Sequence, residues 1–319
     1  MDLGHKETDR LLQELERKIS REYARAYKDI SKKANDYFDK FAAQDEKMLE
    51  KLKNKEITKW DYQQWRTNKM LVGSRWTNLK ETLAKDLTNA DQIAMSYVNG
   101  YTAEVYALNM NYATYDIEHD SRIDTSFTLY DKQTVQRLIK DDPDLLPQPK
   151  VDIPKDLRWN RQHIQSAITQ GILQGESISK MAKRLQKVTD MDKRAAIRNA
   201  RTAVTSSQNA GRLDSYNRAS DMGIALKKVW MATLDDRTRE SHVDLDGEVR
   251  ELDKPFSNGL MYPADPSGAP AEVYNCRCTM VKQYDKYKTD WQNLQNRNSD
   301  KLGNMTYSQW KRERGKKNG

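Results

Sequence analysis

The sequence lacks the features that mark membrane, secreted and low-complexity proteins. No stretch approaches the ~18 consecutive apolar residues of a transmembrane helix, and the segment from Met1 to Lys6 lacks the apolar core of a signal peptide. With only 2 cysteines the chain has no secreted disulfide framework, and 13 glycines and 8 prolines are too few for a low-complexity chain. We therefore expect a protein that is made in a cytoplasm and has no membrane contact.

Apolar side chains are also scarce. Hydrophobic residues make up 37% of the 319 residues, below the ~45–50% that is typical of a globular chain, and the mean hydropathy is −0.98. One large buried core is therefore not expected. Long helices that each bury a single face fit this composition better.

The first third of the chain has the periodicity of long amphipathic helices. Apolar residues recur every three to five positions over 10–53 and more regularly over 79–112. Between these stretches, Thr58 and Asp61 form a capping-box pattern that opens a shorter helix. We predict a long helical hairpin or open bundle over residues 1–118.

Prolines then interrupt the helical pattern. Three of them between 141 and 150 forbid a continuous helix, so residues 119–154 are predicted to be a linker region. Helices return in shorter pieces over 155–226, the last of them from about 193 to 222.

The C-terminal part has a different character. Residues around Val229 have the composition of a strand, and Asp246 with Gly247 indicates a tight turn. We predict a small α+β module over 227–282 and a basic tail over 283–319. The predicted fold class is mainly α, with a small, loop-rich C-terminal module that contains a few short strands.

Charge is distributed unevenly along the chain, whose formal net charge is +8. Residues 158–228 hold 14 basic and 5 acidic residues, a net charge of +9, and residues 282–319 hold 10 and 4, a net charge of +6. Such segments suit a polyanion, although solvated helix faces produce the same pattern. The candidate DNA-binding residues are Lys180, Lys183, Arg184, Lys187, Lys193, Arg194, Arg198 and Arg201.

Three chemical interpretations compete for the segment from Trp230 to Cys278. His242, Cys276 and Cys278 together offer an imidazole and two thiolates, a set that can hold zinc with an aspartate as the fourth ligand. The Cys-X-Cys spacing is tighter than usual, and residues two apart in a strand point to the same face, so both sulfurs could simply be buried. No other cofactor is expected.

The second interpretation is a metal-dependent nuclease, with His242 as general base and Asp235, Asp236, Asp244 or Asp246 as metal ligands. The third is structural. In it, Asp235, Arg237 and Arg239 form a hydrogen-bond and ion-pair network that fixes the loops around His242.

At this segment the sequence resembles a known family, the phage Mu F-like head morphogenesis domain of tailed-bacteriophage minor head proteins. The resemblance covers roughly residues 155–282, including a helical lead-in from Ala200 to Tyr216. The motif residues are Trp230, Thr233, Asp235, Arg237, Arg239, His242, Asp246, Gly247, Asn275, Cys276 and Cys278.

The resemblance implies a minor capsid protein in the interior of the phage head. Its implied partners are the portal protein, other head proteins and double-stranded DNA bound without sequence preference. Toxin relatives in the family carry a catalytic domain after this module, and the segment 283–319 is too short for one, so no enzymatic activity is expected. The alternatives are the metal-dependent enzyme centred on His242, Cys276 and Cys278, and a pure scaffold without DNA contact.

Overall fold

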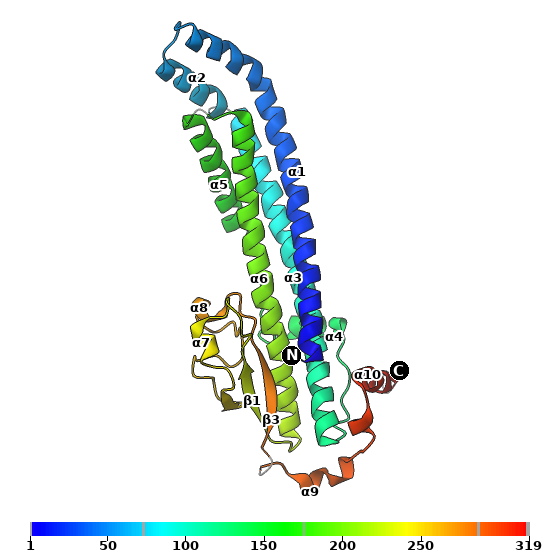
Figure 1. The fold of residues 1–319 in the computed structure, drawn as a ribbon. Coiled ribbons are helices and arrows are strands. Elements are labelled where there is room, and N and C mark those ends of the chain that lie inside the picture. Colours follow the sequence, from blue (N-terminus) through cyan, green and yellow to red (C-terminus); the bar gives the residue numbers. More distant parts are fainter. Residues whose placement is uncertain (1, 72–73, 175, 286–287, 317–319) are drawn as a thin grey trace. The chain divides into compact units, whose positions relative to one another are not determined.

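The computed structural model describes residues 2–71, 74–174, 176–285 and 288–316, and its helices account for most of them (Figure 1), which confirms the mainly α class. None of the helices described is apolar over a length that would cross a membrane. The larger helices are α1 (Leu3–Lys53), α2 (Lys59–Leu71), α3 (Ser74–Ser121), α4 (Lys132–Asp141), α5 (Ile153–Leu173), α6 (Ile178–Asp221) and α10 (Tyr307–Lys316).

The chain forms two compact units that are each assembled from separate segments. Unit 1 comprises Met1–Glu16, Tyr97–Pro149 and Arg198–Gly319. Unit 2 comprises Arg17–Ser96 and Lys150–Ile197. Helices α1, α3 and α6 contribute residues to both units. The sequence led us to expect domains that follow one another along the chain. The two units are instead made of alternating segments, because each of three long helices has residues in both units.

Unit 2 is helical, and its local signals agree with the sequence. The backbone N–H of Thr58 donates to Asp61 Oδ2 at 2.9 Å, and that of Asp61 donates to Thr58 Oγ1 at 3.1 Å, so the predicted capping box opens α2. The apolar stripes of α1 and α3 meet in the core, where Ile19, Leu83 and Leu87 are fully buried.

Helix α6 is continuous where two pieces were expected, with the second starting near residue 193. Residues 189–210 contain no proline or glycine, and Thr189 Oγ1 donates to the carbonyl of Leu185 inside the helix. Polar residues alone do not end a helix that is packed on one face. The expected linker 119–154 likewise contains α4, which Asp131 caps by accepting from the N–H of Thr134.

Unit 1 contains the predicted small sheet, in which β1 (Leu226–Met231) lies between β2 (Val249–Glu251) and β3 (Thr279–Tyr284). Both pairings are antiparallel, and Trp230 of β1 faces Met280 of β3. Two short helices, α7 (Glu240–Val243) and α8 (Pro270–Val273), lie in the long connections between the strands.

Much of the expected basic tail is folded. It forms α9 (Trp291–Leu294), the 3₁₀ helices η1 (Gln295–Arg297) and η2 (Leu302–Asn304), and α10. Trp310 of α10 is only 1% exposed and donates through its indole N–H to Glu118 of α3 at 2.5 Å. Arg314 forms a buried ion pair with the same carboxylate at 2.6 Å. The basic charge of this segment is therefore partly neutralised within unit 1.

Helices α3 and α6 pack closely in unit 1, and Gly211 permits this contact. A Cβ atom at this position would lie 2.6 Å from the carbonyl oxygen of Tyr106 and 3.2 Å from the amide nitrogen of Met110. Both neighbours are backbone atoms, so the two helices would have to separate to admit a side chain.

We expect Gly211→Ala to lower the free energy of unfolding by about 1–3 kcal/mol, because the added methyl group overpacks the helix contact. Urea unfolding followed by circular dichroism measures the change. Gly100→Ala in α3 is the matched control: the nearest atom is the flexible Lys132 amine at 3.3 Å, so we expect no loss and a gain of up to about 1 kcal/mol from helix propensity. Equal unfolding midpoints for the two variants would contradict this account.

Asp192 on α6 is a poorly satisfied carboxylate in unit 2. Its Oδ2 is buried and has no hydrogen-bond partner among the described residues. Burial, together with the nearby carboxylates of Asp91 and Asp156, raises the pKa of Asp192 to about 7. Ionisation of Asp192 therefore opposes folding at neutral pH.

Because the folded-state pKa lies above the unfolded value of 3.8, stability is lost as the pH rises through about 7. We expect Asp192→Asn to raise the free energy of unfolding at pH 8, by on the order of 2 kcal/mol, and this gain to vanish near pH 4. Urea titrations at the two pH values test this. Asp190→Asn, which removes a partly exposed ion pair with Lys193, should change little at either pH; a gain for Asp192→Asn that is the same at both pH values would argue against the mechanism.

Candidate functional site

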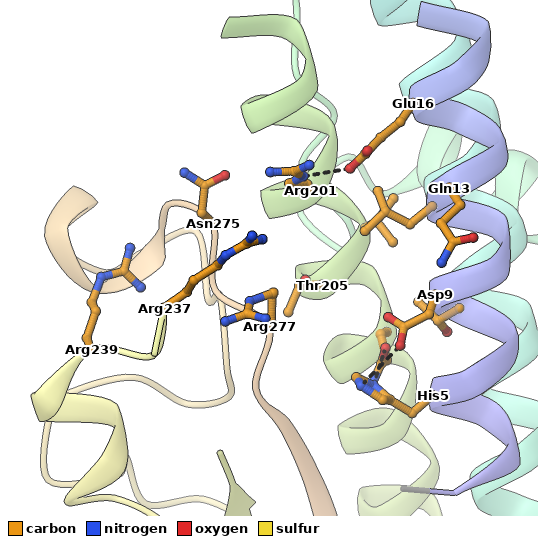
Figure 2. A pocket seen from close by; sticks show the side chains of 14 residues that line it. His5, Asp9, Gln13, Glu16, Arg201, Thr205, Arg237, Arg239, Asn275 and Arg277 are labelled. Atoms are coloured by element: carbon orange, nitrogen blue, oxygen red, sulfur yellow. Dashed lines mark hydrogen bonds and ion pairs between the residues drawn. The ribbon is translucent and has the colours of Figure 1, made fainter. Parts of the chain in front are cut away.

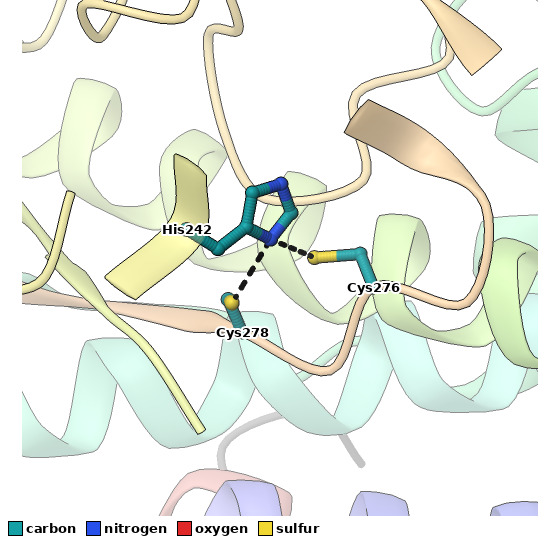
Figure 3. Close-up of side chains that lie close together, drawn as sticks. All are labelled: His242, Cys276 and Cys278. Carbon is teal, nitrogen blue, oxygen red and sulfur yellow. Dashed lines mark hydrogen bonds between the residues drawn. The ribbon is translucent and has the colours of Figure 1, made fainter. Parts of the chain in front are cut away.

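The structure brings His242, Cys276 and Cys278 together in the interior of unit 1 (Figure 3). His242 lies on α7, and the two cysteines directly precede β3. His242 Nδ1 lies 3.4 Å from Cys278 Sγ and 3.8 Å from Cys276 Sγ. All three residues are at most 2% exposed.

Backbone alternation explains why both cysteines lie in the core. Cys276 and Cys278 pack with Trp230 and Phe256 in one hydrophobic cluster, whereas Asn275 and Arg277 face a pocket on the other side. Side chains of successive extended residues point in opposite directions. The expectation that the i and i+2 sulfurs share a buried face is therefore confirmed.

A carboxylate that the sequence analysis missed completes the cluster. Glu272 of α8 lies 3.1 Å from His242 Nε2, and it also accepts a hydrogen bond from Ser241 Oγ at 3.2 Å. The sequence pattern indicated only aspartates as carboxylates near His242. A single glutamate 30 positions away along the chain carries no local signal, because the loops alone bring it to the imidazole.

The two thiols share a proton and differ in acidity. Hydrogen bonding with Cys276 and with His242 lowers the pKa of Cys278 despite its burial. The hydrogen bond to Cys278 and burial raise the pKa of Cys276. One thiolate is therefore stabilised next to the imidazole, a pattern that occurs in both metal sites and reactive cysteines.

Side chains of α6 hold the cysteine segment in place. Thr205 Oγ1 donates to the carbonyl of Cys276 at 2.8 Å. Asn209 Nδ2 donates to the carbonyl of Cys278 at 3.2 Å, and its Oδ1 accepts from the backbone N–H of Met280 at 3.1 Å. The sequence placed these residues in a helical lead-in but gave no sign of what they would contact.

The motif residues near the surface form a different network from the one expected. Asp235 pairs with Arg277, with both nitrogen–oxygen distances at 2.5 Å, and this guanidinium lowers the pKa of Asp235. The Arg237 side chain is exposed and lines the pocket, and Arg239 donates to the carbonyl of Tyr274. The expected ion pairs of Asp235 with Arg237 and Arg239 are therefore not formed, and Asp235 pairs with Arg277 instead. Arg277 is within reach because the segment that leads into β3 lies next to the loop that carries Thr233 and Asp235.

The remaining motif residues shape the turns. Thr233 Oγ1 donates to the carbonyl of Arg277 at 2.7 Å. Asp246 Oδ1 accepts from the backbone N–H of Ala232 at 2.8 Å, and Gly247 has φ +79, a conformation that favours glycine. Among the described residues none of the four candidate aspartates groups with His242, Cys276 and Cys278, so the structure does not bring together the ligands that the nuclease interpretation requires.

A cavity of about 560 Å³ lies on the outer side of the cysteine segment (Figure 2). Four arginines line it, one from α6 and three from the loops between β1 and β3, and Arg201 of α6 is paired with Glu16 at 2.6 Å. Asp9 is the other acidic residue of the lining, so positive charge exceeds negative charge by two. The three loop arginines are Arg237 and Arg239, which belong to the motif, and Arg277, which lies between its two cysteines.

The eight basic candidates of α6 fall into two groups. Lys180, Lys183, Lys187 and Arg194 of unit 2 are exposed and form no ion pair with the described residues. Their spacing places them on one face of the helix. The other candidates are engaged: Arg184 pairs with Glu176 at 2.6 Å, Lys193 with Asp190 at 2.7 Å and Arg201 with Glu16, while Arg198, in unit 1, lies over the Tyr274 ring at 5.8 Å.

Comparison with known families supports the resemblance found in the sequence. Residues 162–281 match the family described as Phage Mu protein F like protein. This match contains α6, the three-stranded sheet up to Val281 and the complete His–Cys–Cys cluster. The resemblance that the motif indicated is therefore confirmed over this part of the chain.

Two relatives extend the similarity beyond the matched segment. The minor head protein GP7 of Bacillus phage SPP1 is 25% identical over 287 residues, which cover 87% of this chain and 84% of GP7. An NAD(+)–arginine ADP-ribosyltransferase of Enterococcus faecalis is 26% identical over 227 residues, 69% of this chain. The matched region spans only 45% of that enzyme. No solved structure matches the chain significantly.

Proposed function

We propose that this chain is a minor head protein of a tailed bacteriophage, that it is incorporated into the head interior with the portal protein and other head proteins, and that it contacts packaged double-stranded DNA. The observation that carries the proposal is the similarity to SPP1 GP7, which extends over 84% of that minor head protein. The match of residues 162–281 to the phage family also supports it.

Exposed positive charge supports the DNA contact. Lys180, Lys183, Lys187 and Arg194 present four exposed cations along one face of α6, none of them in an ion pair with another described residue, and the arginine-lined pocket of unit 1 is a second place where cations gather. The cations on α6 are lysines and one arginine without amide side chains among them, so contacts to phosphates are the interaction that this face fits.

Enzymatic activity is not part of the proposal. The similarity to the ADP-ribosyltransferase covers 45% of that enzyme, and a relative's activity does not transfer through a shared segment. The buried His242 cluster also leaves little room for a substrate, since all three side chains are at most 2% exposed.

The DNA contact is tested with a triple variant, Lys180→Ala, Lys183→Ala and Lys187→Ala. We expect the unaltered chain to bind linear duplexes of different sequence equally and to lose affinity steeply between about 50 and 200 mM salt. In the triple variant, the slope of log affinity against log salt should fall by roughly three, one for each lysine. Fluorescence anisotropy with labelled duplexes measures both quantities.

The matched control removes the same charge from exposed lysines of α1, by Lys47→Ala, Lys51→Ala and Lys53→Ala, and should keep the original slope. A separate Arg237→Ala, Arg239→Ala variant reports on the pocket. An equal decrease of the salt slope in the α1 and α6 triple variants would mean that only the net charge of the protein matters. No binding by the unaltered chain at about 50 mM salt would exclude the DNA contact.

Association with the portal is tested by co-expression with the portal protein of the same phage and affinity capture. We propose the helical region 1–118 as the element that docks on the portal, because Trp60 of α2 is 66% exposed there and exposed tryptophans often dominate interfaces. We expect Trp60→Ala to weaken capture at least about tenfold, whereas Trp159→Ala of α5, 52% exposed in the chain as it stands, should not. Full capture by Trp60→Ala would exclude this docking surface, and no capture by the unaltered chain would exclude the portal.

A further inference from the structure

We propose that His242, Cys276 and Cys278 together bind one Zn²⁺ ion, with solvent as the fourth ligand and Glu272 as the carboxylate that orients the imidazole. This inference is independent of the proposed role in the phage head. It assigns a structural role to the buried centre of the motif.

The spacing of the three ligand atoms suits tetrahedral zinc. With Zn–N and Zn–S bonds of about 2.0 and 2.3 Å, a nitrogen and a sulfur ligand lie about 3.5 Å apart. His242 Nδ1 lies 3.4 Å from Cys278 Sγ and 3.8 Å from Cys276 Sγ, and all three ligand atoms lie within 4.8 Å of one another. Both nitrogen–sulfur distances therefore lie within about 0.3 Å of the value expected for ligands of one zinc ion.

The imidazole is oriented as a metal ligand requires. Glu272 Oε2 lies 3.1 Å from His242 Nε2, so this nitrogen can carry the proton and donate it to the carboxylate. The lone pair of Nδ1 then faces the two sulfurs. A carboxylate on the far nitrogen is the usual support of a zinc-bound histidine, because it fixes the tautomer and raises the basicity of the ligand.

The chemistry of the donors favours zinc over the hard cations. Thiolate and imidazole are preferred ligands of Zn²⁺, whereas Mg²⁺ and Ca²⁺ bind oxygen. Two buried thiolates would carry a charge of −2 in a cluster that also contains Trp230 and Phe256. A divalent cation cancels this charge, which an apolar interior otherwise disfavours strongly.

A bound ion would join three segments that come from a part of the chain with little regular secondary structure. His242 comes from α7, Glu272 from α8, and the cysteines from the start of β3. Between β1 and β3 the regular secondary structure consists of the three residues of β2 and two four-residue helices, and the rest of this connection is loop. Metal coordination at this point would supply part of the folding free energy of the loop-rich module.

The first experiment measures metal in the full chain. The protein is purified without chelator from cells grown with added zinc, and mass spectrometry of the metals is combined with a thiol titration under denaturing conditions. We expect stoichiometric zinc, both cysteines reduced, and a lower melting temperature after EDTA treatment. Replacement of zinc by Co²⁺ should produce a thiolate-to-cobalt charge-transfer band, and this band should weaken in Cys278→Ser and be lost in the double Cys276→Ser, Cys278→Ser variant.

The second experiment separates the metal from ordinary packing. Glu272→Gln keeps the shape of the side chain and removes its charge, and we expect zinc affinity to fall by about 10- to 100-fold. Glu240→Gln changes an exposed glutamate of α7 in the same way and should leave the affinity unchanged. A chelator competition assay reports both values without relying on any activity.

Three results would overturn the zinc site. The first is a folded chain with two free thiols that takes up neither Zn²⁺ nor Co²⁺, in which case the thiols simply hydrogen-bond to the imidazole. The second is a Cys276–Cys278 disulfide in the freshly purified protein. The third is full zinc content in the double Cys276→Ser, Cys278→Ser variant. If the cysteine variants do not fold, the cobalt spectrum of the unaltered chain and the comparison of Glu272→Gln with Glu240→Gln decide the question.

Discussion

The buried hydrogen bonds from α6 to the strand β3 are the constraint on which unit 1 depends. Arg212 is 2% exposed, pairs with Asp2 at 2.7 Å, and donates to the carbonyl of Met280 at 3.0 Å. One turn earlier, Asn209 satisfies the carbonyl of Cys278 and the N–H of Met280. A buried polar group that loses its partner costs about 1–3 kcal/mol, so each of these side chains fixes the strand in one position on the helix. The close approach at Gly211, between them, sets α3 against the same stretch of α6.

This arrangement explains how a chain with so few apolar residues forms a defined interior. In unit 1 a large share of the specificity lies in paired polar groups, such as Arg314 with Glu118 and Lys228, which is fully buried and donates to the carbonyls of Leu252 and Met261. Such pairs add little net stability compared with apolar packing, but they penalise every alternative register that leaves them unpaired. The low hydrophobic fraction is thus compatible with a unique fold.

The sequence predicts those parts of the fold that depend on local rules. Helix periodicity, the capping box at Thr58 and the strand around Val229 are encoded by neighbouring residues, and the structure contains each of them. Contacts between distant segments have no such code. The pairing of Asp235 with Arg277 and the placement of Glu272 beside His242 follow from how the loops close. For the same reason, a metal site of His242, Cys276 and Cys278 was only one of several interpretations that the sequence allowed.

The short run from Asn275 to Cys278 connects the interior of the module to its surface. Its even-numbered positions place two thiols against His242, and its odd-numbered positions place an amide and a guanidinium on the arginine-lined pocket. Because one extended backbone carries both sets, a shift along the strand that moved the sulfurs away from the imidazole would also withdraw Arg277 from Asp235. The geometry of the pocket therefore depends on the buried cluster. This dependence gives a physical reason why cysteines, histidine and surface arginines occur together in one motif: the cluster fixes the backbone that presents the arginines.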